Sequence, residues 1–147
     1  MKKYLVLTAS ILGFLTVQGL PSRADDALEA MIKDPKQWAS PTGDDANTRF
    51  SKLNQINAGN VSKLQVAWTF STGVLRGHEG GPLIVGNIMY VHTPFPNKVY
   101  ALDLSDENKI VWKYEPKQDP NVIPVMCCDT VNRGVCLLYT SPSPRDS

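Results

Sequence analysis

Short strand patterns recur at a nearly constant interval through the middle of this chain. They are "LQVAWTFSTG" at residues 64–73, two runs within "GPLIVGNIMYVHTPF" at 81–95, "NKVYALDL" at 97–104 and "KIVWKYEP" at 109–116. The two runs in the second segment flank a Gly86-Asn87 step, which predicts a β-hairpin. Strands that follow one another every eight to twelve residues are typical of antiparallel all-β architectures. We therefore expect an all-β fold.

The residues before these strands predict one short helix and a long loop. "DDALEAMIKDP", residues 25–35, places Leu28, Met31 and Ile32 on one helical face. Pro35 ends this pattern, because the residue before a proline avoids the helical region. Residues 40–64 are dense in Gly, Pro, Asn, Asp and Ser and predict a loop.

The first 24 residues have the pattern of a signal peptide. Two lysines precede the apolar run "YLVLTASILGFLTV", and small residues follow at Ser22 and Ala24. We expect residues 1–24 to be removed, so that the mature chain begins at Asp25; the alternative is an N-terminal membrane anchor. Export to an oxidising compartment would permit disulfides to form and persist.

The last residues, 136–147, differ in composition from all that precedes them. "CLLYTSPSPRDS" contains two Ser-Pro steps and loses the apolar alternation. It resembles the translation of a sequencing adapter read in frame, and the alternative is a short disordered tail. On the first interpretation the natural sequence stops near Val135 and Cys136 is not part of it.

Several functions are not supported by the composition. The chain has 15 Lys and Arg against 14 Asp and Glu, so there is no basic excess to attract nucleic acid or an anionic membrane. His78 and His92 are 14 residues apart without a third ligand at a recognised spacing, and we interpret both as loop or core histidines. The sequence contains neither a phosphate-binding glycine loop nor a nucleophile elbow.

Cys127 and Cys128 are adjacent, which is unusual for an exported chain. Consecutive Cα atoms lie about 3.8 Å apart, whereas ordinary disulfides join Cα atoms roughly 4.4 to 6.8 Å apart. The two residues are therefore free thiols, partners of distant cysteines, or a strained eight-membered ring that serves a purpose.

Three segments together resemble a known family of enzymes. "ALDLSDENKIVWKYEP" is similar to the tryptophan-docking motif of quinoprotein alcohol dehydrogenases, with Ala101, Asp103 and Trp112 at the motif positions and "DEN" replacing its usual turn. "STGVLRGHEGGPL" at 71–83 and "PNVIPVMCCDTVNRG" at 120–134 resemble the N-terminal part of methanol dehydrogenases that use pyrroloquinoline quinone (PQQ). The "EGGP" form is most similar to their lanthanide-dependent branch. From the residues alone, Trp112 is equally well a core residue of any β-sheet.

The resemblance implies a fold and a site. The fold would be the N-terminal part of an eight-bladed β-propeller. Cys127 and Cys128 would close into a vicinal disulfide against one face of PQQ, Arg133 would contact the cofactor, and Glu79 would lie at its edge. A guanidinium grips a carboxylate through two hydrogen bonds, and PQQ carries three carboxylates. The alternatives are a surface pair of Arg133 with Asp129, and a solvated loop position for Glu79.

The resemblance also implies an activity. The whole protein would be a periplasmic, homodimeric enzyme that oxidises methanol or another primary alcohol and passes electrons to a c-type cytochrome. A lanthanide or calcium ion would act as Lewis acid, with its ligands and the catalytic base beyond residue 135. The alternatives are a non-enzymatic periplasmic β-propeller scaffold and a PQQ dehydrogenase for ethanol or another alcohol. Residues 25–135 alone are expected neither to fold cooperatively nor to oxidise methanol, because open sheet edges would remain.

Overall fold

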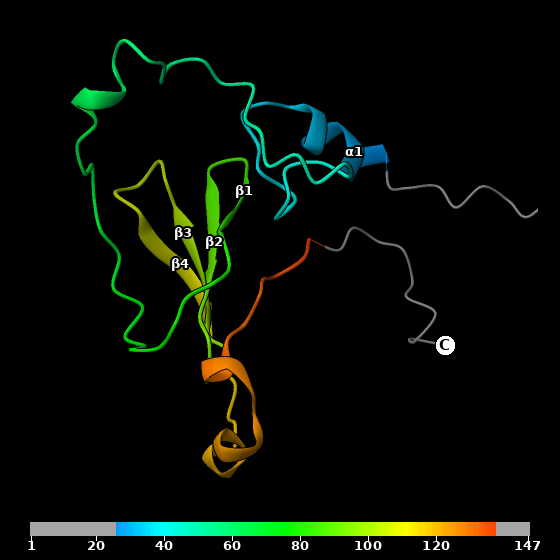
Figure 1. Ribbon diagram of the computed structural model, residues 1–147, viewed down its shortest axis with the longest axis vertical. Helices are drawn as coiled ribbons and strands as arrows, with labels where there is room; N and C mark the ends of the chain where they lie inside the picture. The colour runs from blue at the N-terminus through cyan, green and yellow to red at the C-terminus, as the bar shows by residue number, and fades with distance from the viewer. Residues whose placement is uncertain (1–25, 138–147) are drawn as a thin grey trace, which may run out of the picture.

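The computed structural model describes residues 26–137, and its centre is one antiparallel sheet of four strands (Figure 1). The strands follow one another in the order of the sequence: β1 (Leu83–Val85), β2 (Ile88–His92), β3 (Val99–Asp103) and β4 (Lys109–Tyr114). Gly86 opens the β1–β2 turn with φ +60°, the left-handed conformation that a two-residue hairpin turn requires. The expected hairpin and the two strands after it are confirmed, as is an antiparallel β architecture.

Three-residue and six-residue 3₁₀ turns supplement the one α-helix among residues 26–137. The helix α1 spans Asp26–Lys33, as the sequence predicts, and none of its residues is buried. The 3₁₀ turns are η1 (Val61–Lys63), η2 (Pro120–Val125) and η3 (Cys128–Thr130). Across residues 26–137, no helix combines the length and the apolar character needed to cross a membrane.

The β3–β4 pair explains the spacing of the tryptophan-docking motif. Ala101 lies opposite Trp112, and the next pair is Leu102 with Ile110, so Val111 is an extra residue in a β-bulge. Asp103 accepts hydrogen bonds from the backbone N–H and the hydroxyl of Ser105, at 2.8 and 2.6 Å, and so shapes the turn between the strands. The motif is therefore a hairpin in which the acid forms the turn and the tryptophan returns opposite the alanine.

The prediction of a β-strand at residues 64–73 is wrong. This segment is extended but unpaired, and Val66 and Trp68 are 80% and 40% exposed. A β-strand requires a neighbour for its backbone hydrogen bonds, and no strand of residues 26–137 lies beside this one. The end of the segment is held to the sheet by Tyr100, whose hydroxyl donates to the carbonyl of Thr72 at 2.9 Å.

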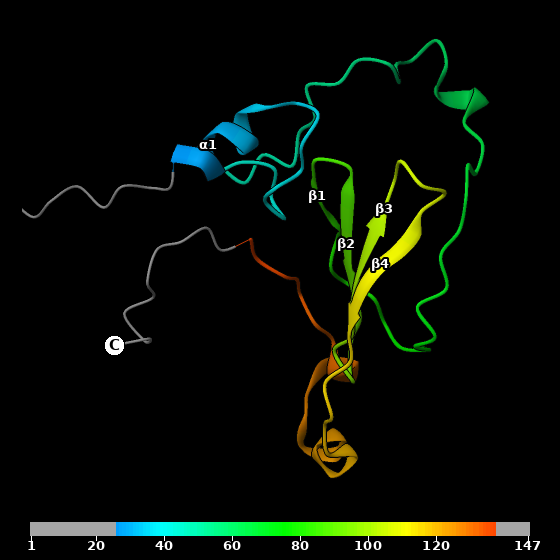
Figure 2. The ribbon, with the colours of Figure 1, turned by 180° about the vertical axis from the view of Figure 1, so that it is seen from behind.

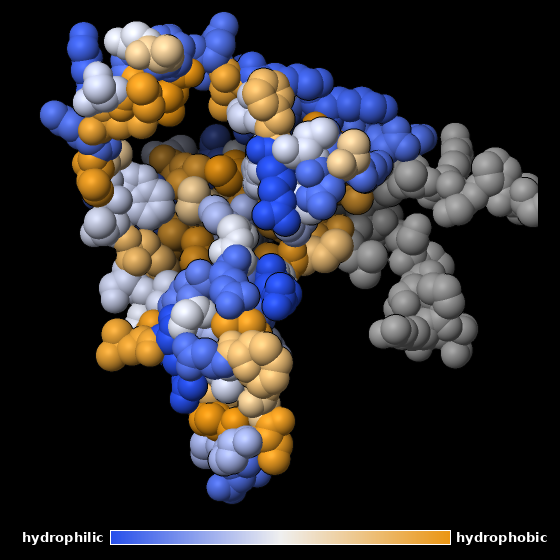
Figure 3. Space-filling model, in the orientation of Figure 1, coloured by the Kyte–Doolittle hydropathy of each residue, from blue (hydrophilic) through white to orange (hydrophobic). Residues whose placement is uncertain are grey.

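The buried core is small and lies at β3 and the end of β2. Its apolar members are Ala39, Leu83, Tyr100, Ala101 and Leu102, and the polar residues His92, Thr93 and Thr130 are also buried. Many large apolar residues elsewhere are exposed, and Figure 3 shows hydrophobic surface lining the hollow between the sheet and the loop that arches away from it. The view from behind in Figure 2 shows the same arch and, below the sheet's lower end, the segment that contains η2 and η3.

The two ends of the chain lie outside the described residues. The predicted signal peptide, residues 1–24, falls there, and so do residues 138–147 of the tail. Both interpretations stay predictions.

Candidate functional site

Residues 76–80 and 127–133 lie side by side, although about fifty residues separate them in the sequence. The Asp129 carboxylate joins them with both oxygens. One oxygen lies 3.2 Å from Nη1 of Arg76, and the other accepts the backbone N–H of Gly77 at 2.9 Å. A Cβ at Gly77 would make ordinary van der Waals contact with Asp129 and Val131, at 3.4 and 3.9 Å. The Asp129 contact places the "RGHEGG" loop, residues 76–81, against the turn at residues 127–130, which we call the cysteine turn.

The adjacent cysteines form a disulfide with each other. Cys127 and Cys128 are both exposed, so the eight-membered ring presents sulfur to its surroundings. Cys128, Asp129 and Thr130 follow in the left-handed region, with φ of +62°, +54° and +59°. Such a conformation costs an L-residue roughly 1–2 kcal/mol, and backbone strain of this kind concentrates at functional sites.

The surrounding backbone holds the strained turn in place. The N–H of Thr130 donates to the carbonyl of Cys127 at 3.0 Å, and the carbonyl of Thr130 accepts the N–H of Phe95 at 3.0 Å. Asn132 adds a side-chain hydrogen bond to Asn97 at 3.1 Å. The connection between β2 and β3 is therefore hydrogen-bonded to the cysteine turn and stabilises its conformation.

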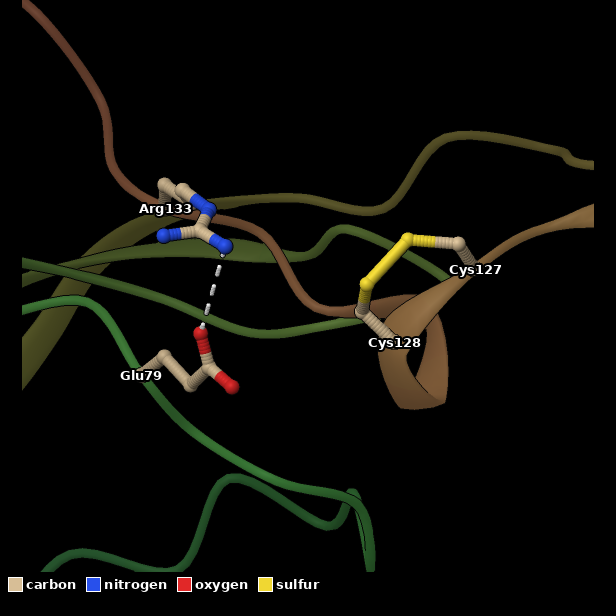
Figure 4. Close-up of a disulfide and its surroundings, with 4 residues drawn as sticks. All are labelled: Glu79, Cys127, Cys128 and Arg133. Carbon is tan, nitrogen blue, oxygen red and sulfur yellow. Dashed lines mark ion pairs between the residues drawn. A yellow bond between two sulfur atoms is a disulfide. The ribbon is translucent and has the colours of Figure 1, made fainter.

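Glu79 and Arg133 face each other beside the disulfide (Figure 4). Nη2 of Arg133 lies 3.9 Å from Oε2 of Glu79, and the two side chains are 80% and 51% exposed. So long and exposed an ion pair contributes little to stability. Arg133 does not pair with Asp129, because the Asp129 carboxylate forms its ion pair with Arg76. Within the described part of the chain the guanidinium makes no hydrogen bond, so its donors remain available to another acid.

His92 lies where the two segments meet the sheet. It ends β2 and is 4% exposed, and its Nε2 lies 3.2 Å from the carbonyl oxygen of Asn132. Burial lowers the pKa of its imidazole below the usual value. The neutral ring therefore carries its proton on Nε2, which donates to Asn132. Its Nδ1 is buried without a partner among residues 26–137.

The other histidine stays within its own loop. His78 is exposed, and its two ring nitrogens lie 2.8 Å from the carbonyl of Arg76 and 3.1 Å from the hydroxyl of Thr72. In the described ranges, no three His, Cys, Asp or Glu side chains gather as metal ligands would. The two histidines have different surroundings, and sequence spacing alone gave no sign of that difference.

Sequence reasoning missed the residues that assemble this site. It considered Asp129 as a partner of Arg133, and it did not identify Arg76 or Asn132. The signal that was present is the acid directly after the cysteine pair, together with an arginine in the other segment. Asn132 acts through its backbone carbonyl, which accepts the hydrogen bond from His92, and such a contact leaves no pattern in the sequence.

The assembled surface suits a flat, anionic molecule. A disulfide ring is rigid and polarizable, and sulfur makes favourable contacts with aromatic rings. Arg133 supplies an available cation, and a Cβ at Gly81 would meet nothing within 4 Å, so the backbone there is open to a close approach. Thr130 adds a buried hydroxyl that has no partner in the part of the chain described. These features fit a planar polycarboxylate cofactor such as PQQ.

Comparison with known proteins gives one family and several similar chains. The family described as "glucose/ethanol/alcohol dehydrogenase, beta-propeller domain", a PQQ family, matches residues 38–143. A lanthanide-dependent methanol dehydrogenase of Methylorubrum extorquens is 70% identical over 115 residues, which are 78% of this chain and 19% of that protein. Subunit 1 of a cytochrome c methanol dehydrogenase from Paracoccus denitrificans is 48% identical over 128 residues, 86% of this chain and 20% of the relative.

A solved structure is similar as well. A europium-containing methanol dehydrogenase aligns with a TM-score of 0.75 and 53% sequence identity, over 78% of this chain and 20% of that one. The chain thus spans about a fifth of the length of the curated relatives it matches.

Proposed function

Because the chain belongs to the PQQ-dependent β-propeller family of glucose, ethanol and alcohol dehydrogenases, we propose that the whole protein oxidises methanol or another primary alcohol to the aldehyde. The observation that carries this proposal is the Cys127–Cys128 ring beside an arginine whose donors are available. A β-propeller that acts only as a scaffold has no use for such a ring. Methanol is favoured over ethanol by the names of the most similar relatives.

We infer that a lanthanide, in preference to calcium, serves as the metal ion. The support is the higher identity to a lanthanide-dependent enzyme, 70%, than to the cytochrome c methanol dehydrogenase subunit, 48%. The metal ligands and the catalytic base would come from residues other than those described. A c-type cytochrome as electron acceptor and a periplasmic location complete the proposal, supported by the name of one relative and by the leader-like residues 1–24. A homodimer is proposed from the family resemblance alone.

Each site residue has a distinct role in this proposal. PQQ, when bound, would accept the hydride equivalent that leaves the alcohol, which is two electrons and one proton. The disulfide ring restrains the cofactor without a side-chain rotor that must be ordered on binding. Arg133 binds a carboxylate of the cofactor and remains charged when water is excluded. Glu79 accepts hydrogen bonds in the cofactor plane, and the nearby guanidinium offsets the repulsion between two anions.

The test uses a full-length chimera in which residues 26–135 replace the matching segment of the Methylorubrum extorquens relative. PQQ is titrated into the metal-loaded apo-chimera, and bound cofactor is measured by absorbance. We expect saturable binding and methanol oxidation. Arg133→Gln should weaken PQQ binding about tenfold or more, because a charge-assisted hydrogen bond contributes roughly 1.5–3 kcal/mol. Lys109→Gln, a matched change of an exposed cation at the start of β4, should leave binding unchanged.

Two results would contradict the proposal. A folded chimera that binds no PQQ would favour the scaffold alternative. Binding that Arg133→Gln and the double change Cys127→Ser, Cys128→Ser both leave intact would show that these residues are not the cofactor surface.

A further inference from the structure

We propose that His92 is a positioning residue of the PQQ site: its buried imidazole fixes the distance between the segment that carries Glu79 and the segment that carries Arg133. This inference rests on the proposed function, since it assigns a role to a residue that does not itself face the cofactor surface. It starts from two contacts of one ring, one to each segment.

The first contact is to the cysteine-turn segment. The Nε2–H of His92 donates to the carbonyl oxygen of Asn132 at 3.2 Å, across forty residues of sequence. Asn132 directly precedes Arg133, so this hydrogen bond fixes the backbone from which the guanidinium extends. A second hydrogen bond, from the Asn132 amide to Asn97, prevents the same backbone from rotating away.

The second contact is to the "RGHEGG" loop. A Cβ at Gly80 would overlap Nε2 and Cε1 of His92, and it would lie 2.9 Å from the carbonyl oxygen of Arg133. The Gly80 backbone therefore rests directly on the imidazole and beside the Arg133 backbone. Glu79 directly precedes Gly80, so the imidazole fixes the position of the backbone from which the glutamate side chain extends. Glu79 and Arg133, the sequence neighbours of the two residues that contact the ring, are the pair that face each other at 3.9 Å.

The chemistry of the ring supports a role beyond filling space. His92 is 4% exposed and its Nδ1 has no partner in the described residues, so burying an imidazole here costs free energy that an apolar side chain would avoid. What an apolar side chain does not offer is the N–H that reaches Asn132. A role in packing alone would therefore be served better by phenylalanine than by histidine.

The experiment measures the dissociation constant of PQQ for the metal-loaded apo-chimera and for two His92 variants. His92→Phe fills a similar volume without a donor, and His92→Gln retains a side-chain N–H. We expect His92→Phe to weaken PQQ binding about tenfold, which corresponds to about 1.4 kcal/mol, and His92→Gln to restore it to within about threefold. Lys109→Gln, which changes an exposed cation at the start of β4, is the control and should have no effect.

A second pair of variants approaches the same contact from the other side. Gly80→Ala adds a methyl group that must push the imidazole away, whereas the control Gly59→Ala adds one in the loop before η1, away from the site, where the nearest atom is the Asn57 side-chain oxygen. We expect Gly80→Ala to weaken PQQ binding about tenfold, and thermal unfolding of the apo-proteins to confirm that each variant is folded. This pair decides the question if His92→Phe fails to fold.

The outcomes separate this inference from the proposed function. If the unmodified chimera binds no PQQ, the proposed function fails. If it binds PQQ and His92→Phe binds equally well, or if His92→Gln is as impaired as His92→Phe, the positioning role is overturned.

Discussion

Replacement of Asp129 should release the "RGHEGG" loop from the cysteine turn. Its carboxylate is the single group that binds both Arg76 and the N–H of Gly77, at 3.2 and 2.9 Å. Asp129→Ala removes both contacts, and Asp129→Asn keeps one carbonyl oxygen for the Gly77 N–H while it removes the charge. The two variants therefore separate the hydrogen bond from the ion pair.

The magnitude follows from the geometry. The Asp129 side chain is 58% exposed, so its ion pair with Arg76 contributes only about 0.5 kcal/mol. The charge-assisted hydrogen bond to Gly77 contributes about 1 kcal/mol at such exposure. Alanine tolerates the φ of +54° less well than aspartate, which adds roughly 0.5 kcal/mol. We expect Asp129→Ala to destabilise the contact by about 2 kcal/mol, and Asp129→Asn by about half as much.

Hydrogen exchange of the chimera is the appropriate assay, because it reports local opening in a large protein. The amide of Gly77 should exchange about thirtyfold faster in Asp129→Ala, since each 1.4 kcal/mol is a factor of ten. Amides of β3, which Asp129 does not contact, are the internal control. An unchanged rate at Gly77, or equal acceleration by alanine and asparagine, would refute the reasoning.

Three further predictions concern charge and packing. Two lysines lower the pKa of Glu115 from 4.5 to about 2, so the stability that its carboxylate contributes is lost as the pH falls from about 4.5 toward 2. Over that pH range the thermal unfolding midpoint of the chimera should fall less in the Glu115→Gln variant than in the unmodified chimera. Equal falls in the two proteins would contradict this prediction. Burial lowers the pKa of His92, so its neutral form stabilises the fold above about pH 6.5 and this contribution is lost as the pH falls. His92→Gln should therefore remove that part of the pH dependence of exchange in residues 76–80; a retained dependence would point to another group. Leu102→Ala, at a fully buried site, should lower the free energy of unfolding of the chimera by about 2–5 kcal/mol in chemical denaturation. Ile110→Ala, at a half-exposed site, should lower it by about 1 kcal/mol, and equal losses would contradict the assigned core.

The strands that could be predicted from the sequence are those with local signals. The Gly86-Asn87 turn and the alternation on either side of it determine β1 and β2 without reference to distant residues. The segment 64–73 has an equally good alternation but no partner strand in the described residues, and pairing is not a property of the segment itself. Local patterns therefore identify candidate strands, and tertiary contacts decide which of them pair.

Some residues of the candidate site could likewise be identified from the sequence, and others only from tertiary contacts. Glu79, Cys127, Cys128 and Arg133 were identified through resemblance to a family, and the structure joins the cysteines and brings the two charged residues together. Their role in cofactor binding stays a prediction. His92 could be recognised as buried only from its position at the end of β2, next to a glycine twelve residues earlier in the chain. A contact between an imidazole and a glycine backbone leaves no signature in spacing or composition.

The most direct test of this account is a crystal structure of the chimera with PQQ and a lanthanide ion bound. We expect the Cys127–Cys128 ring to lie against one face of the cofactor, with the Arg133 guanidinium within hydrogen-bond distance of one of its carboxylates. A cofactor bound elsewhere, with the disulfide in contact with solvent alone, would contradict the central claim.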